Sequence, residues 1–326
     1  MATVFVTGGT GLIGANICRQ LRERGDTVRA LVRPGSESSP LRALGVTLAA
    51  GDITAASDVL AAAGDAEFVV HSAAVLGGAS QDLAEHQRVN TGGLGHVLDA
   101  AATVGAKRTV ALGTTTYFDY ATTPLDEQSP LLDAPPSDPY SVSKRAAFVE
   151  TMRRAAEGLD VCVVIPGGTF GPSPVPMRAL EPPSYNLRIR LALAGELDHA
   201  VHFPIPWSYA ADVAAITVAA LDRGVAGEKY LAFASPQDVC STAEFLNRAC
   251  ELAGSDRRIR DITAAELDAD PALADEIGPS LVALARRRFP EPYFRDPLTR
   301  SRLGHVPLRL DEALRRTLTW LAVEHP

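Results

Sequence analysis

The stretch Thr3-Val4-Phe5-Val6-Thr7-Gly8-Gly9-Thr10-Gly11-Leu12-Ile13-Gly14 predicts a buried strand, a glycine-rich turn and the start of a helix. Glycines in this pattern allow a tight turn, close approach of a pyrophosphate to the backbone, and close packing of helix on strand. The helix N-terminus would meet the phosphates with free N–H groups and the positive end of its dipole. Its position between strand and helix favours a dinucleotide site over a purely structural turn. The expected contacts are Thr7, Gly8, Gly11, Leu12, Ile13 and Gly14.

Short β-branched runs alternate with helical stretches through the first half of the chain. The predicted strands are residues 3–7, 27–32, 46–50, 67–71, 108–112 and 160–165, and the predicted helices are residues 11–24, 55–63, 82–104 and 140–157. This alternation is typical of an α/β fold with a doubly wound parallel sheet. Two proline-rich segments, 122–139 and 172–183, follow predicted strands at the edge of the sheet where ligands bind.

The chain beyond Ser235 is mostly helical and rich in arginine. It ends in an amphipathic helix with leucines at 310, 314, 318 and 321 on one stripe. We interpret it as part of a smaller lobe. The predicted dinucleotide-binding domain is 1–165 plus about 199–234, and the substrate-binding lobe is about 166–198 plus 235–326.

Composition excludes several classes of function. The 326 residues carry a formal net charge of −8, which provides no basic surface for nucleic acid or an anionic membrane. No apolar run reaches the length of a membrane span, and the apolar N-terminus is expected to be a strand rather than a signal peptide. The four cysteines, Cys18, Cys162, Cys240 and Cys250, are too scattered for a zinc site or redox pair. We expect a cytoplasmic protein with reduced cysteines and no metal.

Tyr140 and Lys144 stand four residues apart, a spacing that places both side chains on one face of a helix. A free phenol has a pKa of about 10, so a nearby ammonium that stabilises the phenolate would make the tyrosine a better acid. The chain has only three lysines, which makes a chance pairing improbable. An exposed helical pair without function is the alternative.

Arg33 ends the second predicted strand, and no acidic residue lies nearby. An acid at this place would hold the ribose diol of NAD(H), whereas an arginine can pair with the 2′-phosphate of NADP(H). We therefore expect NADP(H) in preference to NAD(H). The alternative is that Arg33 only faces solvent.

Taken together, these residues resemble the extended short-chain dehydrogenase/reductase family, also called the NAD-dependent epimerase/dehydratase family. The resemblance covers nearly the whole chain and rests on the glycine turn, the Tyr140/Lys144 pair and four further motifs: Gly51-Asp52-Ile53, His71-Ser72-Ala73-Ala74, Val89-Asn90, and Ile165 to Pro172. It implies a Rossmann-type fold and a homodimer packed through 82–104 and 140–157. The further cofactor contacts that it implies are Asp52, Ile53, Ala73, Ala74, Tyr140, Lys144, Pro166, Gly168 and Thr169.

The same resemblance implies the catalytic roles. Tyr140 would be the acid, Lys144 would lower the pKa of the tyrosine and reach the nicotinamide ribose, and a hydroxyl after the fifth strand would hold the substrate oxygen. Alignment on the strand gives Thr114 for that hydroxyl, with Thr115 as the alternative.

Departures from the family pattern narrow the substrate. Sugar-nucleotide members carry polar residues where this chain has Ile165, Gly168 and Ile205-Pro206, so no clamp for a diphosphate is evident. We expect an apolar pocket and an NADP(H)-dependent reductase of a ketone or aldehyde on a fairly apolar small molecule, similar to dihydroflavonol reductases, ketone reductases and hydroxysteroid dehydrogenases. The alternatives are a sugar-nucleotide epimerase or dehydratase that uses bound NAD, and a non-catalytic NADP-sensing protein. The expected pocket residues are Leu76, Tyr117, Phe170, Met177, Tyr185 and Trp207.

Overall fold

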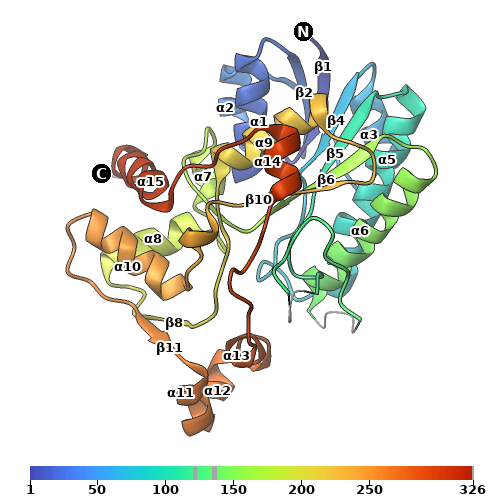
Figure 1. Cartoon of the computed structure of the whole chain (residues 1–326). Coiled ribbons are helices and arrows are strands. Elements are labelled where there is room, and N and C mark those ends of the chain that lie inside the picture. The colour runs from blue at the N-terminus through green and yellow to red at the C-terminus, as the bar shows by residue number, and fades with distance from the viewer. Residues whose placement is uncertain (120–122, 134–137, 325–326) are drawn as a thin grey trace.

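A seven-stranded sheet forms the centre of the molecule, in a computed structural model that describes residues 1–119, 123–133 and 138–324 (Figure 1). The strand order is β10-β6-β5-β4-β1-β2-β3, and every neighbouring pair is parallel. The prediction of a doubly wound parallel α/β sheet is confirmed. The strands are β1 (Thr3–Thr7), β2 (Thr27–Val32), β3 (Thr47–Ala50), β4 (Phe68–His71), β5 (Arg108–Leu112), β6 (Val161–Pro166) and β10 (Lys229–Ala232).

Helices cover both faces of this sheet (Figure 1). The first face carries α1 (Leu12–Glu23), α9 (Ala210–Arg223) and, beside them, α2 (Ser39–Ala43) and α14 (Pro297–Leu303). The second face carries α3 (Ala56–Ala63), α5 (Gly93–Val104) and α6 (Pro139–Ala156).

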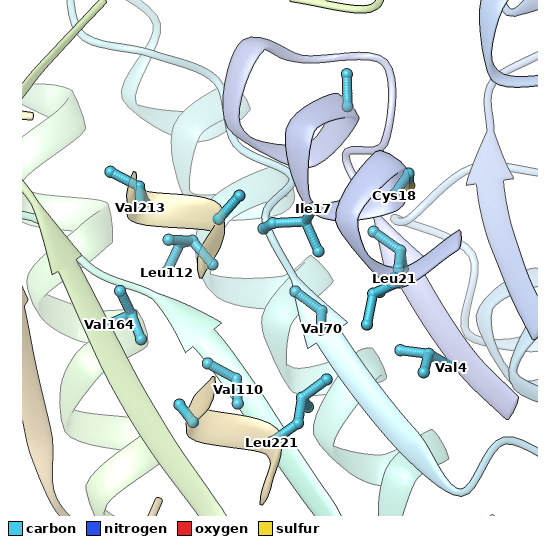
Figure 2. Close-up of a cluster of buried hydrophobic side chains, with 14 of the residues drawn as sticks. Val4, Ile17, Cys18, Leu21, Val70, Val110, Leu112, Val164, Val213 and Leu221 are labelled. Atoms are coloured by element: carbon cyan, nitrogen blue, oxygen red, sulfur yellow. The ribbon is translucent and has the colours of Figure 1, made fainter. Parts of the chain in front are cut away.

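Figure 2 shows the core on the first face, where α1 and α9 meet the sheet. Ile17 and Leu21 of α1 pack toward Val70 of β4 and Val110 of β5, and Val213 and Leu221 of α9 close the other side. These valines and leucines are almost fully excluded from solvent. Burial of the strands on both faces explains why they appear in the sequence as continuous apolar runs rather than alternating ones.

The helix predicted over 82–104 is interrupted. Its first turn is α4 (Leu83–His86), a π-helical turn η1 (Gln87–Gly92) follows, and only then does α5 begin. The π turn places the buried Asn90 toward the loop after β4 and toward α6, and a π-helical turn is a feature that often accompanies a functional site.

A smaller lobe follows the C-terminal edge of the sheet. Its two-stranded sheets pair β7 (Gly168–Phe170) with β9 (Trp207–Tyr209), and β8 (His199–Val201) with β11 (Arg260–Ile262). β8, which falls within the range 199–234 expected for the first domain, pairs with a strand from the range expected for the lobe. The helices of the lobe are α7 (Pro176–Ala179), α8 (Tyr185–Ala194), the 3-10 turn η2 (Pro236–Asp238), α10 (Thr242–Leu252), α11 (Ala264–Ala269), α12 (Pro271–Ile277), α13 (Pro279–Arg286) and α15 (Leu310–Glu324).

The core of this lobe is assembled from distant parts of the chain. Phe170 and Trp207 pack with Phe245 of α10, and the rings of Trp207 and Phe245 are stacked 3.7 Å apart. Leu310, Leu314 and Leu321 of α15, all buried, cover the same cluster, as do residues of α8.

All four cysteines carry free thiols. Burial raises the pKa of Cys18 and of Cys162 to about 12, so both stay protonated at neutral pH. No helix among the described residues has both the length and the apolar character needed to cross a bilayer. Across those same residues, no group of histidine, cysteine and acidic side chains is arranged to hold a metal ion.

Candidate active site

The glycine turn between β1 and α1 has the geometry that a dinucleotide needs. Gly8 has a φ of +74°, and a Cβ there would lie 2.5 Å from the backbone nitrogen of Ala73. A Cβ on Gly14 would lie 2.1 Å from the carbonyl oxygen of Gly8, so the helix packs directly on the turn. A Cβ on Gly11 would meet only that same oxygen, at 3.4 Å. Gly11 therefore faces open space at the N-terminus of α1, where the N–H groups of the first turn can receive a phosphate.

The turn sits where the strand order reverses, between β1 and β4, which is where open α/β sheets bind ligands. Thr7 and His71 are register partners at the ends of these strands, and Thr7 Oγ1 lies 2.9 Å from His71 Nδ1. Burial, and secondarily the charge of Lys144, lowers the pKa of His71 to about 3, so its imidazole is neutral. The predicted contacts Thr7, Gly8 and Ala73 are thus brought together at one place.

The predicted adenine-side residues follow β3. Thr54 donates two hydrogen bonds to Asp52 Oδ1, and these are the main reason why the pKa of that carboxyl is lowered, with smaller contributions from Arg33 and Arg88. Arg33 is exposed at the end of β2. Arg88, on η1, is a second cation near Asp52 that sequence reasoning missed, because its distance in the chain gives no sign of this proximity.

The predicted catalytic residues converge at the C-terminal end of β5. Asp138 caps α6 and starts the helix that carries Tyr140 and Lys144 on one face. Lys144 Nζ donates a 2.7 Å hydrogen bond to the carbonyl of Leu112, two residues before Thr114. A hydrogen-bonding interaction with the Thr114 side chain acts to lower the pKa of the Tyr140 phenol, which burial raises. This interaction supports the expectation that Thr114 carries the hydroxyl beside the phenol.

Burial dominates the electrostatics of this group. It raises the pKa of Tyr140, and the hydrogen bond with Thr114 opposes that rise. It also lowers the pKa of Lys144 to about 8. Behind Lys144 lies a cavity of about 10 Å³, about enough for one water molecule, lined by His71 and Tyr117 among others.

Asn90, on η1, forms hydrogen bonds to both the loop after β4 and helix α6. Its Oδ1 accepts from the N–H of Val75 at 2.8 Å, and its Nδ2 donates to the carbonyl of Val75 and to Ser143 Oγ, both at 3.0 Å. Ser143 lies on α6 between Tyr140 and Lys144, and its hydroxyl donates to the carbonyl of Tyr140. One amide therefore holds the loop after β4 against α6.

The predicted contacts on the nicotinamide side follow β6. Pro166 pairs with Ala232 of β10, and Gly168 begins β7 beside Trp207. Thr169 Oγ1 donates to the carbonyl of Gly167 at 3.1 Å. A Cβ on Gly168 would come within 2.7 Å of Ile205 and 3.0 Å of the Trp207 ring. These apolar neighbours occupy the room that a polar side chain at 168 would need.

The structure corrects part of the predicted substrate pocket. Tyr117, Phe170 and Trp207 are at most 1% exposed, and they pack inside aromatic clusters rather than on an open surface. Each had been predicted from its apolar character alone, which core packing also demands. Tyr185 packs edge-on against Trp207 in the same lobe. Leu76 and Met177, in contrast, are 50% and 64% exposed.

Residues 4–233 match the model of the NAD dependent epimerase/dehydratase family. The chain is similar along nearly its whole length to sterol demethylase protein B of Methylococcus capsulatus. The two are 29% identical over 342 residues, and the match covers 98% of each chain. A 3-beta-hydroxysteroid dehydrogenase of Mycolicibacterium neoaurum is 28% identical over 187 residues, covering 52% of this chain and 48% of that protein.

Solved structures share the fold. The crystal structure of gox2253 superposes with a TM-score of 0.85 at 23% identity, covering 100% of this chain and 99% of the other. PA4631, described as a nucleoside-diphosphate-sugar epimerase from Pseudomonas aeruginosa, superposes with a TM-score of 0.81 at 22% identity, covering 99% and 98%. At these identities the likeness concerns the fold alone.

Proposed function

The chain belongs to the NAD-dependent epimerase/dehydratase family, and from that membership we propose that it is an NADP(H)-dependent oxidoreductase acting on a fairly apolar small molecule. It would reduce a ketone or aldehyde, or oxidise the matching alcohol. The observation that carries this proposal is the convergence of Thr114, Tyr140 and Lys144 beside the glycine turn.

The glycine turn and the ends of β3, β4 and β6 fit a dinucleotide. Gly11 and the first turn of α1 would hold the pyrophosphate, and Asp52 and Ile53 would lie at the adenine. Arg33, with its exposed guanidinium near Asp52, would pair with a 2′-phosphate. When bound, the nicotinamide supplies or accepts a hydride.

Side chains of this protein would then transfer the proton that accompanies the hydride. The Tyr140 phenol donates its proton to the substrate oxygen as that oxygen becomes an alkoxide, and takes the proton back in the oxidative direction. Thr114, hydrogen-bonded to Tyr140, holds the same oxygen. Lys144, anchored on Leu112, places a cation beside the developing phenolate.

Two observations support an apolar substrate. Ile165 is fully buried, and Ile205 and Trp207 fill the space next to Gly168, so positions 165, 168 and 205 carry no polar side chain for a diphosphate. Relatives named sterol demethylase protein B and 3-beta-hydroxysteroid dehydrogenase point in the same direction.

We also propose that the protein forms a homodimer through the helical faces of α5 and α6. Size-exclusion chromatography with light scattering tests this proposal, and a monomer across the working concentration range would contradict it.

A panel of ketones and aldehydes, including steroid ketones, tests the proposed activity through the loss of NADPH absorbance. Tyr140→Phe is the control, because it removes the donated proton while leaving the glycine turn intact. We expect turnover with at least one apolar carbonyl compound, and a loss of nearly all turnover in the variant with unchanged NADPH binding. Full activity of Tyr140→Phe would refute the mechanism, and tight binding of uridine or thymidine diphosphate together with NAD would favour a sugar-nucleotide enzyme.

A further inference from the structure

His86, the last residue of α4, is fully buried beside the catalytic helix. Its ring meets the Tyr140 ring edge-on, with centroids 6.3 Å apart and planes at 71°. Its Nε2 lies 3.1 Å from the carbonyl oxygen of Ser80, and its Nδ1 lies 3.3 Å from Asn90 Nδ2. The proposed mechanism uses neither nitrogen, so this buried imidazole needs another explanation.

The hydrogen-bond network favours one tautomer of His86. Asn90 Oδ1 accepts from the N–H of Val75, which fixes the orientation of the amide and turns its NH₂ group toward His86. The two hydrogens of this NH₂ group go to the Val75 carbonyl and to Ser143 Oγ, so the group offers no acceptor to an N–H on Nδ1 of the imidazole. The proton then resides on Nε2 and is donated to the carbonyl of Ser80. The geometry therefore favours the Nε2–H tautomer, because an N–H on Nδ1 would point at the NH₂ group of Asn90.

This tautomer links the loop after β4 to the phenol. The loop runs from Val75 to Asp82, and a Cβ on Gly77 within it would lie 3.3 Å from Cδ1 of Tyr140. The next residue, Gly78, approaches Pro183 in the segment before α8. The bond from His86 to Ser80 thus holds the part of the loop that borders the Tyr140 ring.

We propose that His86 is a positioning residue that clamps the loop 75–82 against Tyr140 and so shapes the place where the carbonyl substrate meets the phenol. The clamp consists of the bond to Ser80, the contact with Asn90 and the ring contact with Tyr140. Its effect on turnover rests on the proposed function, whereas the tautomer and the order of the loop do not.

Two substitutions separate the polar role of His86 from its packing role. His86→Gln keeps an acceptor and a donor on one side chain, whereas His86→Phe keeps a ring and removes both. We expect His86→Phe to lower kcat about tenfold or more and to raise the KM of the carbonyl compound, because misplacement near the reacting atoms is costly. His86→Gln should recover most of the loss. NADPH affinity should stay within about twofold in both, since the glycine turn is untouched.

Two measurements on the full-length protein do not depend on turnover. The ¹⁵N chemical shifts of His86 in the wild type should report the neutral Nε2–H tautomer, and an Nδ1–H tautomer or an imidazolium at neutral pH would overturn the proposal. Hydrogen exchange of residues 75–82 should accelerate in His86→Phe and remain near wild type in His86→Gln and in the surface control His199→Phe.

These outcomes distinguish the clamp from the proposed function. If the wild-type protein shows no carbonyl turnover but has the expected tautomer and exchange pattern, the proposed function is refuted and the clamp is supported. Conversely, if the wild type is active and the His86→Phe variant keeps wild-type kcat, KM and loop exchange, the clamp is refuted and the proposed function is supported. If His86→Phe fails to fold, the tautomer measured in the wild type still decides.

Discussion

Lys144 Nζ donates a hydrogen bond of 2.7 Å to the backbone carbonyl of Leu112, the last residue of β5. This bond anchors the ammonium, carried by α6, on the end of a central strand, two residues from Thr114. The lysine is only 7% exposed, so its charge is held where water screens it little.

The burial of Lys144 predicts a specific dependence of stability on pH. Its pKa is lowered from 10.5 to about 8 in the folded protein, so between these values the unfolded chain binds more protons than the folded one. The free energy of unfolding contributed by this group therefore rises with pH over that interval, by up to roughly 3 kcal/mol. Lys144→Met lacks the titration. Urea unfolding of both proteins without coenzyme should show that the unfolding free energy of the wild type rises relative to that of the variant from about pH 8 upward. A difference that is constant with pH would contradict the lowered pKa of Lys144.

Thr114 should be required for its hydroxyl and not for its size. Thr114→Val keeps the shape but removes the hydrogen bond to Tyr140, and we expect kcat to fall by about 10²–10³. Thr114→Ser should retain activity within about tenfold by the same reasoning. Steady-state kinetics with the best substrate of the panel measure this effect. Thr115→Val is the matched neighbour, and a larger loss there than in Thr114→Val would reverse the assignment.

Arg33 should set the coenzyme preference. Arg33→Ala removes the cation expected at the 2′-phosphate, so NADPH should bind about 10- to 100-fold more weakly while NADH binding changes little. Fluorescence titration with both coenzymes measures the ratio. The exposed Arg316 of α15, paired with Glu312, gives a control variant, Arg316→Ala, that should alter neither affinity. Tighter NADH than NADPH binding by the wild type would contradict the prediction outright.

Gly11 and Gly14 should respond differently to the same added methyl group. On Gly14 it would overlap the carbonyl of Gly8, so Gly14→Ala should lose at least about 2 kcal/mol of unfolding free energy. On Gly11 it would meet little protein, so Gly11→Ala should lose less than about 1 kcal/mol yet bind coenzyme poorly. Thermal unfolding and coenzyme titration of the pair separate the roles. Equal coenzyme affinity in Gly11→Ala and wild type would place the pyrophosphate elsewhere.

The central sheet could be predicted from sequence because its strands are buried on both faces. Apolar runs such as 108–112 coincide with the observed strand, and the first six strands agree within one residue at each end. The break of the helix over 82–104 was missed, since it depends on the tertiary hydrogen bonds of Asn90 rather than on local pattern. The pairing of β8 with β11 joins residues about 60 apart in the chain and leaves no periodic signal.

The predicted site residues that the structure brings together are those whose residue type has one main physical use. Glycine in a strand–turn–helix, and tyrosine with lysine on one helical face, each point to a single geometry, and the structure brings them together at one edge of the sheet. Aromatic residues have two uses, since they serve cores and pockets equally well. Tyr117, Phe170 and Trp207 were predicted for the pocket and lie in cores. His86 carried no signal in the sequence beyond its place four residues before Asn90.

The core of the smaller lobe has a consequence for synthesis. It joins Phe170 and Trp207 to Phe245 of α10 and to the leucines of α15, so its apolar surface is complete only with residues 310–321. The seven strands of the central sheet, by contrast, have all been synthesised once residue 232 has been added. During translation the aromatic residues of the lobe therefore remain partly exposed until α15 has left the ribosome. A nascent chain of this protein would most need a chaperone during that interval.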